Sequence, residues 1–415
     1  MKKRLFTLAL LPLLFAGGVL FTSCDDDDND GWMIYSPCIT FKNVSEVEPF
    51  IQSGIFGSVA PGASTSFTFH AAKGQRLMLA AMYSYSNDLF FAPENPGIEL
   101  FDNAGVPRTG VVADAVALWD NGTRQNEAPG AEILHPGAAQ SGTVSRIEGI
   151  DEQGNSYVKA SELMEVSLSF APEQSLFTCT IRNLSAGTAN ETPFSSGVYA
   201  ISNVLQDKLV EETPLFTRGE ASSAPLTALA ESGNVLPLAE WLEEQTGIFT
   251  TLNGALVVIY DGDQNPIYTL GSIDEGRGLA SLAQKGDPKA LADALRRLSS
   301  VRNVYYTSDV VLPGKSVECY YSAAPGDRIT YALMFGYSND WFFTSGPKLW
   351  ALEGGDLTDQ TLLLDAGVAV SQYPGAGNAQ WLFDGTPIPE KQPIMQVGST
   401  YPLPDLDELI EVIIR

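Results

Sequence analysis

The chain has 415 residues, of which 50 are Asp or Glu and 24 are Lys or Arg, so its formal net charge is −26 at pH 7. A surface of this charge repels nucleic acid and anionic lipid headgroups, and it suits divalent cations. Hydrophobic residues make up 44% of the chain, which is enough for a folded core. The length predicts about two to three domains.

The first residues are typical of an export signal. Three basic residues, Lys2 to Arg4, precede an apolar run that ends at Phe21. A short apolar segment after a positive start predicts a signal peptide, here over residues 1–23, and not a membrane-spanning helix. The small residue before Cys24 resembles the lipobox of bacterial lipoproteins, which implies that Cys24 carries lipid and holds the mature chain at a membrane. An ordinary secretory signal with a chance cysteine is the alternative.

An acidic run follows directly after Cys24. Five of the six residues in Asp25–Asp30 are aspartates. A like-charge block of this kind repels itself and stays solvated, so it predicts a tether over residues 24–34. The run also resembles the acidic surface-export signal of lipoproteins in one phylum of Gram-negative bacteria. That resemblance implies an outer-membrane protein exposed at the cell surface, whereas a plain spacer is the alternative.

Most of the remaining chain occurs twice. Met82–Phe91 carries a Ser-Asn-Asp-aromatic motif that returns in Met334–Phe343. The other matched segments are Phe67–Gly74 with Cys319–Gly326, Leu118–Gly122 with Leu363–Gly367, Glu162–Leu168 with Glu408–Ile414, and Ile39–Ser45 with Cys179–Ser185. Self-similarity of this kind indicates a duplicated domain. We therefore expect one domain at residues 35–171 and a second at residues 175–415.

The second copy carries an additional segment, at about residues 197–300, that is itself duplicated. Leu226–Asn234 matches Leu279–Asp287, and the leucine spacing predicts a short helix in each. Gly233 and Gly286 should end these helices, as glycine does at helix C-termini, and another helix should follow each. The first copy lacks the segment, so we expect it to be a short form of the domain.

Elsewhere the pattern is that of β-strands. Apolar residues alternate with polar ones around Phe67 and Phe69 and again around Val317 and Cys319, and Gly, Pro and Asn turns divide the segments. This pattern predicts a mainly β protein made of antiparallel sandwiches. Cys319 takes the place of Phe67 in the repeat, so we expect it to fill the core.

The residues that could carry chemistry are few. The only histidines, His70 and His135, do not recur in the repeat, and no Cys/His cluster indicates a zinc or haem site. No GxSxG elbow, P-loop or HExxH motif is present, so we expect no enzyme. Besides Cys24, the cysteines are Cys38, Cys179 and Cys319; one disulfide can form in an oxidising compartment, and the sequence leaves its pairing open.

These motifs together resemble the bacterial spondin N-terminal domain family. The resemblance rests on Pro61-Gly62-Ala63-Ser64, the Ser-Asn-Asp-aromatic motif, the Trp-Asp-x-Gly-Thr motif that begins at Trp119, and the Leu-Ala-Glu-x-Gly-Asn helix that begins at Leu229. It covers residues 35–415 as two tandem copies. The family fold that it implies is an antiparallel, C2-like β-sandwich with helices in one connection.

The resemblance also implies a calcium ion among loop carboxylates. The positions that match are Asp88 and Asp120 in the first copy and Asp340 and Asp365 in the second. The family's third acidic position is Arg124 in the first copy and Ala369 in the second, so the match is incomplete. Glu127 is a substitute ligand in the first copy. Because Asp and Asn also favour turns through bonds to their own backbone, the alternative is that these are turn residues.

We expect a lipid-anchored binding or adhesion module at the cell surface, with an extracellular glycan or protein as ligand. Two other functions remain open: a structural spacer lipoprotein without a specific ligand, and a carbohydrate-active enzyme that uses a carboxylate pair. Tryptophans near the loop motifs either present binding faces or fill the core. They are Trp119, Trp341, Trp350 and Trp381.

Overall fold

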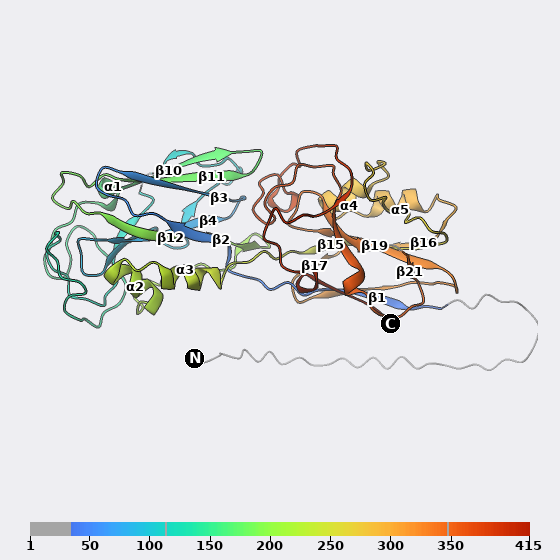
Figure 1. Ribbon diagram of the computed structural model, residues 1–415, viewed down its shortest axis with the longest axis horizontal. Coiled ribbons are helices and arrows are strands. Elements are labelled where there is room, and N and C mark those ends of the chain that lie inside the picture. Colours follow the sequence, from blue (N-terminus) through green and yellow to red (C-terminus); the bar gives the residue numbers. More distant parts are fainter. Residues whose placement is uncertain (1–34, 113, 347) are drawn as a thin grey trace, which may run out of the picture. The chain divides into compact units, whose positions relative to one another are not determined.

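The computed structural model describes residues 35–112, 114–346 and 348–415. Within them the protein is mainly β, with antiparallel sheets in sandwich-like pairs and few helices (Figure 1). The predicted signal peptide (1–23), the lipidation site Cys24 and the acidic tether (24–34) lie outside the described residues. No helix in the described part of the chain is long and apolar enough to cross a membrane.

One pair of sheets, here called the first sandwich, is formed by a continuous stretch of chain. Its larger sheet runs in the order β2 (Phe50–Phe56), β12 (Phe194–Ser202), β4 (Arg76–Tyr83), β5 (Leu89–Ala92), β8 (Ala117–Asp120) and β9 (Ser145–Arg146), with β6 (Ile98–Glu99) beside β4. Its smaller sheet runs in the order β3 (Ser64–His70), β11 (Leu176–Asn183), β10 (Met164–Ala171) and β7 (Gly110–Val111).

The other pair, the second sandwich, repeats this arrangement. Its larger sheet runs in the order β16 (Val301–Tyr306), β15 (Leu252–Tyr260), β19 (Arg328–Phe335), β20 (Trp341–Ser345), β23 (Thr361–Asp365) and β24 (Met395–Gln396), with β17 (Val310–Val311) beside β15 and β21 (Leu349–Trp350) beside β19. Its smaller sheet runs in the order β18 (Ser316–Tyr320), β1 (Cys38–Asn43), β25 (Ile410–Ile414) and β22 (Gly355–Asp356). The short remaining elements are β13 (Val204–Leu205), β14 (Lys208–Leu209), α1 (Ala160–Leu163), η1 (Thr358–Gln360), η2 (Trp381–Phe383) and η3 (Leu406–Glu408).

Aromatic side chains fill the space between the two sheets of each sandwich. Phe67 of β3 stacks on Tyr199 of β12, with 4.3 Å between ring centroids. Phe41 of β1 meets Tyr331 of β19 edge-on at 5.1 Å. The alternation seen in the sequence places such residues on the inner face of each strand. Cys319 packs against this core in the second sandwich, as expected for a residue that replaces Phe67.

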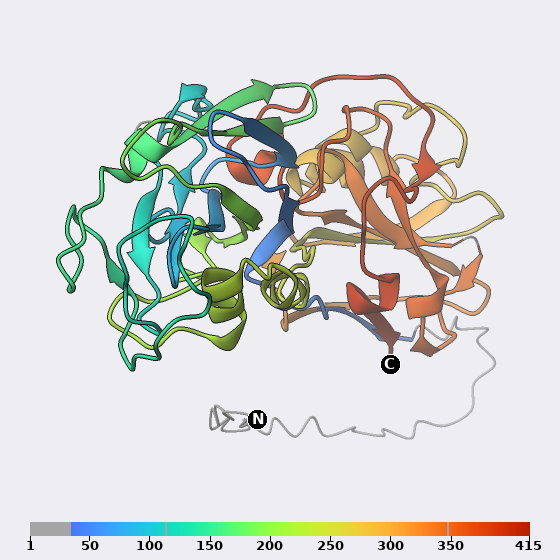
Figure 2. The same ribbon diagram turned by 60° about the vertical axis from the view of Figure 1, so that its left-hand side comes forward.

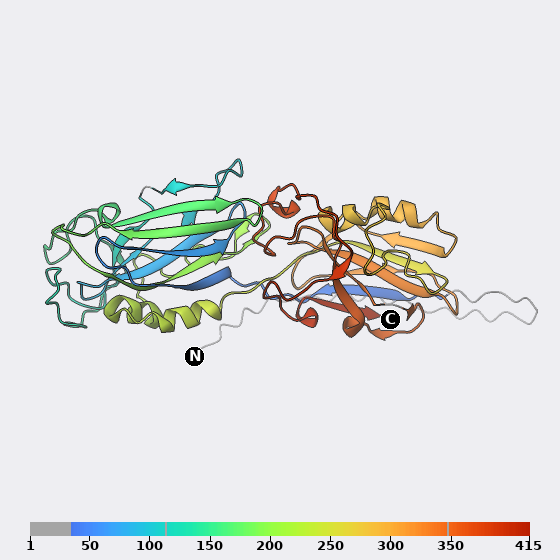
Figure 3. The same cartoon turned by 45° about the horizontal axis from the view of Figure 1, so that its top comes forward.

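Each sandwich has its own pair of helices against the outer face of its larger sheet (Figure 3). In the first sandwich they are α2 (Ala224–Ser232) and α3 (Leu236–Glu243), and in the second α4 (Leu279–Lys285) and α5 (Lys289–Leu295). Gly233 and Gly286 end α2 and α4 in the left-handed conformation, at φ 66° and 67°, as the sequence predicts. The apolar side of each pair is buried; in α2 it includes Leu226 and Leu229.

The strand pairing does not match the expected division of the chain at residues 171–175. β1, expected in the first domain, pairs with β18 and β25 of the second sandwich. β11, expected in the second domain, pairs with β3 and β10 of the first. Figure 2 shows the blue segment that leads from β1 into β2 and so passes from one sandwich to the other. The first sandwich is therefore residues 50–243, and the second is residues 38–43 with residues 252–414.

The two sandwiches contain equivalent elements in a circularly permuted order. In the first, β10 leads into β11 through a turn, and β12 and the helices follow. In the second, the matching ladder joins β25 and β1, which no turn connects: the N–H groups of Cys38 and Arg415 each donate to the other's carbonyl at 2.9 Å. The first copy is consequently not a short form. The duplicated helical segment supplies one helix pair to each sandwich.

Hydrogen bonds donated by side chains join the two sandwiches. Gln75 Nε2 donates to the Gly375 carbonyl at 2.8 Å, and Tyr337 Oη donates to the Val204 carbonyl at 3.0 Å, both in buried positions. One hydrophobic cluster contains core residues from both sandwiches. These contacts satisfy backbone groups that would otherwise be buried without partners, which stabilises the junction.

Candidate functional site

Asp88 lies fully buried in the tight turn between β4 and β5. The Ser86 hydroxyl closes this turn by accepting the Leu89 N–H at 2.9 Å. One carboxylate oxygen of Asp88, Oδ2, accepts the backbone N–H groups of Thr123 and Arg124, each at 2.8 Å. The other oxygen, Oδ1, is buried and has no hydrogen-bond partner among the described residues. Asp88 therefore joins two loops and keeps one acceptor unused.

Asp120 ends β8 and approaches Asp88 from the second loop. Its Oδ1 accepts the Gly122 N–H at 2.6 Å, and its Oδ2 accepts Asn126 Nδ2 at 2.6 Å. Gly122 has a φ of 76°, a conformation that favours glycine. Burial and then the charge of Asp88 raise the pKa of Asp120 to about 6. The two carboxylates thus lie close together in one buried, negatively charged site.

The second sandwich repeats the same geometry. Asp340 Oδ2 accepts the backbone N–H groups of Val368 and Ala369 at 2.7 and 2.9 Å, and its buried Oδ1 has no partner in the described part of the chain. Asp365 Oδ1 accepts the Gly367 N–H at 2.8 Å. Burial, and then the charge of Asp365, raises the pKa of Asp340 well above its usual range. Asp120 and Asp365 both form the turns that the alternative interpretation expected.

The donor set of the first sandwich fits a calcium ion, but only weakly. Three buried oxygens lack hydrogen-bond partners among the residues described: Asp88 Oδ1, Asn121 Oδ1 and Asn126 Oδ1. Calcium takes six to eight oxygen ligands, including carboxylates and amide carbonyls. Glu127 is exposed and does not complete the set, because no group of three or more His, Cys, Asp or Glu within the described ranges is arranged to hold a metal ion.

The second sandwich offers fewer donors. Asp340 Oδ1 is the unpartnered carboxylate oxygen there. Asp365 Oδ2 already accepts Trp341 Nε1 at 3.1 Å and Ser371 Oγ at 2.9 Å. A cation in this loop would compete with both of those hydrogen bonds, so we expect it to bind less well than in the first sandwich.

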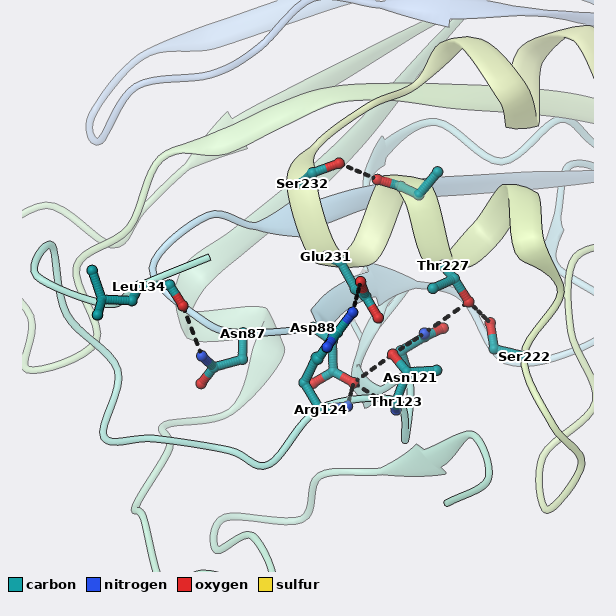
Figure 4. Close-up of polar contacts among 11 residues, drawn as sticks. Asn87, Asp88, Asn121, Thr123, Arg124, Leu134, Ser222, Thr227, Glu231 and Ser232 are labelled. Carbon is teal, nitrogen blue, oxygen red and sulfur yellow. Dashed lines mark hydrogen bonds and ion pairs between the residues drawn. The ribbon is translucent and has the colours of Figure 1, made fainter. Parts of the chain in front are cut away.

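A polar link that the sequence did not predict joins the first aspartate loop to α2 (Figure 4). The Arg124 guanidinium pairs with Glu231 of α2 at 2.9 Å, which turns its charge toward the helix. Asn121 Nδ2 donates to Thr227 Oγ1 of the same helix at 3.2 Å. Both pairs are replaced together in the second copy. The matching residues are Ala369 with Gln284 and Ala366 with Ala280.

We expect Glu231→Gln to destabilise the first sandwich by about 1 kcal/mol, since it leaves the half-buried Arg124 guanidinium without its ionic partner. The matched substitution in the second sandwich, Gln284→Ala, should change stability by less than about 0.5 kcal/mol, because Gln284 has no such partner. Urea unfolding of the two variants measures the difference. Equal effects would mean that the Arg124–Glu231 pair does not stabilise the loop.

The tryptophans divide into core and surface. Trp119 and Trp341 are 2% and 3% exposed and belong to the core. Trp350 and Trp381 are 46% and 45% exposed, but Arg328 lies over the first ring at 4.4 Å. Lys285 lies over the second at 4.6 Å. A positively charged side chain covers one face of each exposed ring, so neither ring offers two open faces to a sugar.

In the part of the chain that the structure describes, the histidines and cysteines form no reactive group. His70 and His135 contact the backbone carbonyls of Gln174 and Ser84 at 2.8 and 3.1 Å, at separate places. The cysteines described by the structure are all free thiols: Cys38, Cys179 and Cys319. Burial raises the pKa of the Cys179 thiol to about 12, which makes it a poor nucleophile.

Comparison with known proteins adds no relative: no protein-family model matches the chain, and no curated protein matches it.

Proposed function

We propose that the chain is a lipid-anchored binding or adhesion module of the cell surface, built of two C2-like sandwiches of spondin type and stabilised by calcium. One observation carries this proposal: both sandwiches hold an aspartate that joins two loops through one oxygen and keeps a second, buried oxygen unpartnered. A structural spacer without ligands has no need of two such costly carboxylates. Lipid on Cys24 would supply the membrane contact, and the acidic tether would supply the distance from it.

Calcium would supply positive charge to the loop pair of the first sandwich. Asp88 Oδ1 and the amide oxygens of Asn121 and Asn126 are the groups that would hold it. Asp88 already fixes the position of the second loop through two backbone N–H groups. The Arg124 side chain is paired with Glu231 and so does not neutralise this carboxylate directly. The expected result is a stiffer loop pair at one end of the sandwich.

We expect millimolar calcium to raise the melting temperature of the chain by a few degrees, because a weak site has a dissociation constant on the order of 0.1–1 mM. Asp88→Asn should abolish most of this rise, since it removes the free carboxylate oxygen. Asp340→Asn should have a smaller effect. Glu240→Gln, an exposed carboxylate outside both loops, is the matched control and should leave the rise unchanged. A rise that survives in Asp88→Asn would place the calcium elsewhere.

Binding itself is tested on arrays of glycans and of extracellular proteins, with calcium and with a chelator. A binding module should bind a defined ligand, and that binding should weaken when calcium is removed. A structural spacer should bind none. A carbohydrate-active enzyme would instead release products from an arrayed glycan.

A further inference from the structure

A groove runs along β2 at the edge of the first sandwich, and its lining includes no residue of the Asp88 and Asp120 loops. It consists of one pocket of about 590 Å³ and another of about 350 Å³. Both are lined by Thr246, Gly247 and Ile248, so the two pockets are neighbours on either side of one short segment. The larger one follows residues 51–55 of β2 and is closed by α3 and Tyr373. Its volume is in the range of pockets that bind ligands.

One side of β2 is available for pairing along this groove. The strand pairs with β12 on its other side. On the groove side, Phe50 forms a short parallel bridge: its N–H donates to the Gln245 carbonyl at 3.1 Å, and its carbonyl accepts the Gly247 N–H at 2.9 Å. Beyond Phe50 no described strand covers this side. Unpaired backbone groups of an edge strand are a template for an added strand.

The aromatic residues of the groove do not present open faces. A Cβ at Gly54 would meet the Tyr199 ring at 2.8 Å, so the strand lies directly on one face of that ring. Phe67 stacks on Tyr199 at 4.3 Å. Tyr373 is 9% exposed and stacks with His70 at 5.0 Å. The covered rings leave no aromatic platform on which a sugar could stack, and so this floor favours an extended peptide over a glycan.

The charge of the groove is uniformly negative. No Lys or Arg lines either pocket, and none of the groove carboxylates forms a salt bridge within the residues described. Burial, and then the charge of Glu46, raises the pKa of Glu48 above its usual value. A cationic occupant would relieve this repulsion. The carboxylates are those of Glu46, Glu48, Glu243, Asp407 and Glu408.

We propose that this groove binds an extended, basic peptide segment of a partner protein, which adds a strand to the free edge of β2 and places Lys or Arg side chains against the groove carboxylates. The basic peptide is a class of partner for the proposed binding module. The inference rests on that proposed function only in treating the chain as a protein that binds a ligand. The groove shares no residue with the aspartate loops. Either site can therefore fail without the other.

The test measures fluorescence anisotropy of a labelled, alternating lysine–valine octapeptide with the detergent-solubilised full-length chain. We expect saturable binding at physiological salt that persists in a calcium chelator. The double variant Glu48→Lys/Glu243→Lys should weaken binding about tenfold, because it reverses two charges that face the peptide. Glu240→Lys, on the same helix but outside both pockets, makes a matched charge change and should alter binding less than about twofold. Melting temperatures confirm that the variants fold.

Three results would overturn the proposal. Equal weakening by Glu240→Lys would show a general attraction to the acidic chain. Equal binding of the same peptide with alternate backbone nitrogens methylated would exclude strand addition. Binding of an arrayed glycan that the double variant abolishes, without binding of the peptide, would assign the groove to a sugar. A loss of the calcium response in the aspartate variants leaves all three comparisons intact.

Discussion

Residues 49–247, produced alone, should fold into a β-rich domain that unfolds cooperatively, whereas residues 35–172 and residues 173–415 should both fail to fold. The reason is the strand pairing. A cut at residue 172 removes β11 from its place between β3 and β10, and it leaves β1 without the sheet that it completes. Every strand and helix of the first sandwich lies within residues 49–247. Circular dichroism and urea unfolding of the three pieces give the answer.

The matched control is a permuted second sandwich: residues 248–415, a short linker, and residues 36–46. Cys38 and Arg415 are already hydrogen-bonded to each other, so the linker replaces the turn that joins β10 and β11 in the first sandwich. This chain should fold, while residues 248–415 without the added strand should not. Cooperative unfolding of residues 35–172 alone would contradict the assignment of β1 to the second sandwich and of β11 to the first.

Asn43→Ala should destabilise the second sandwich by about 2–4 kcal/mol, since it leaves several buried backbone groups without partners. Asn43 is fully buried, and its Nδ2 donates to the carbonyls of Thr250 and Val311 at 2.8 and 2.9 Å. Its Oδ1 accepts the Ser45 N–H at 3.1 Å. The side chain thus holds the end of β1 to two other segments. Urea unfolding, followed by a probe in each sandwich, measures the loss.

Asn183→Ala in the first sandwich should cost a similar amount, because Asn183 Nδ2 donates in the same way to the carbonyls of Val59 and Thr192 at 3.0 and 2.7 Å. Ser45→Ala is the milder control: it removes one hydrogen bond to Asn43 and leaves the carbonyls paired, at a cost of about 1 kcal/mol. A change below about 0.5 kcal/mol in the free energy of unfolding of both asparagine variants would show that these two side chains do not hold the strand ends in place.

Local features of the fold were predictable from the sequence, and the partners of two strands were not. Alternating apolar residues identify strands, and Gly233 and Gly286 identify helix ends, because both signals arise within a few residues. Ile39–Ser45 and Cys179–Ser185 were matched correctly as equivalent segments, since each lies beside the last strand of its repeat. The same alternation fits either sandwich, however. β1 joins a sheet whose other strands lie far along the chain. For β11 the repeat pointed to the second domain, although a short hairpin joins it to β10 of the first.

The candidate site was predictable only where a motif marks it. Asp88 and Asp120, and their repeats, are brought together as the family resemblance implied. The link from Arg124 to Glu231 was missed, although one signal for it existed: both partners change in the second copy. The groove along β2 has no motif, because its lining comes from five separate segments of the chain.

Lipid anchoring at the cell surface can be measured in cells that carry the wild-type chain or Cys24→Ala. Both are fed an alkyne fatty acid and then treated, intact, with external protease. We expect the wild-type chain to be labelled, to sediment with membranes and to be cut by the protease, and Cys24→Ala to be unlabelled and to leave the membrane fraction. Labelling that persists in Cys24→Ala, or a labelled wild-type chain that the protease cannot reach, would contradict this expectation.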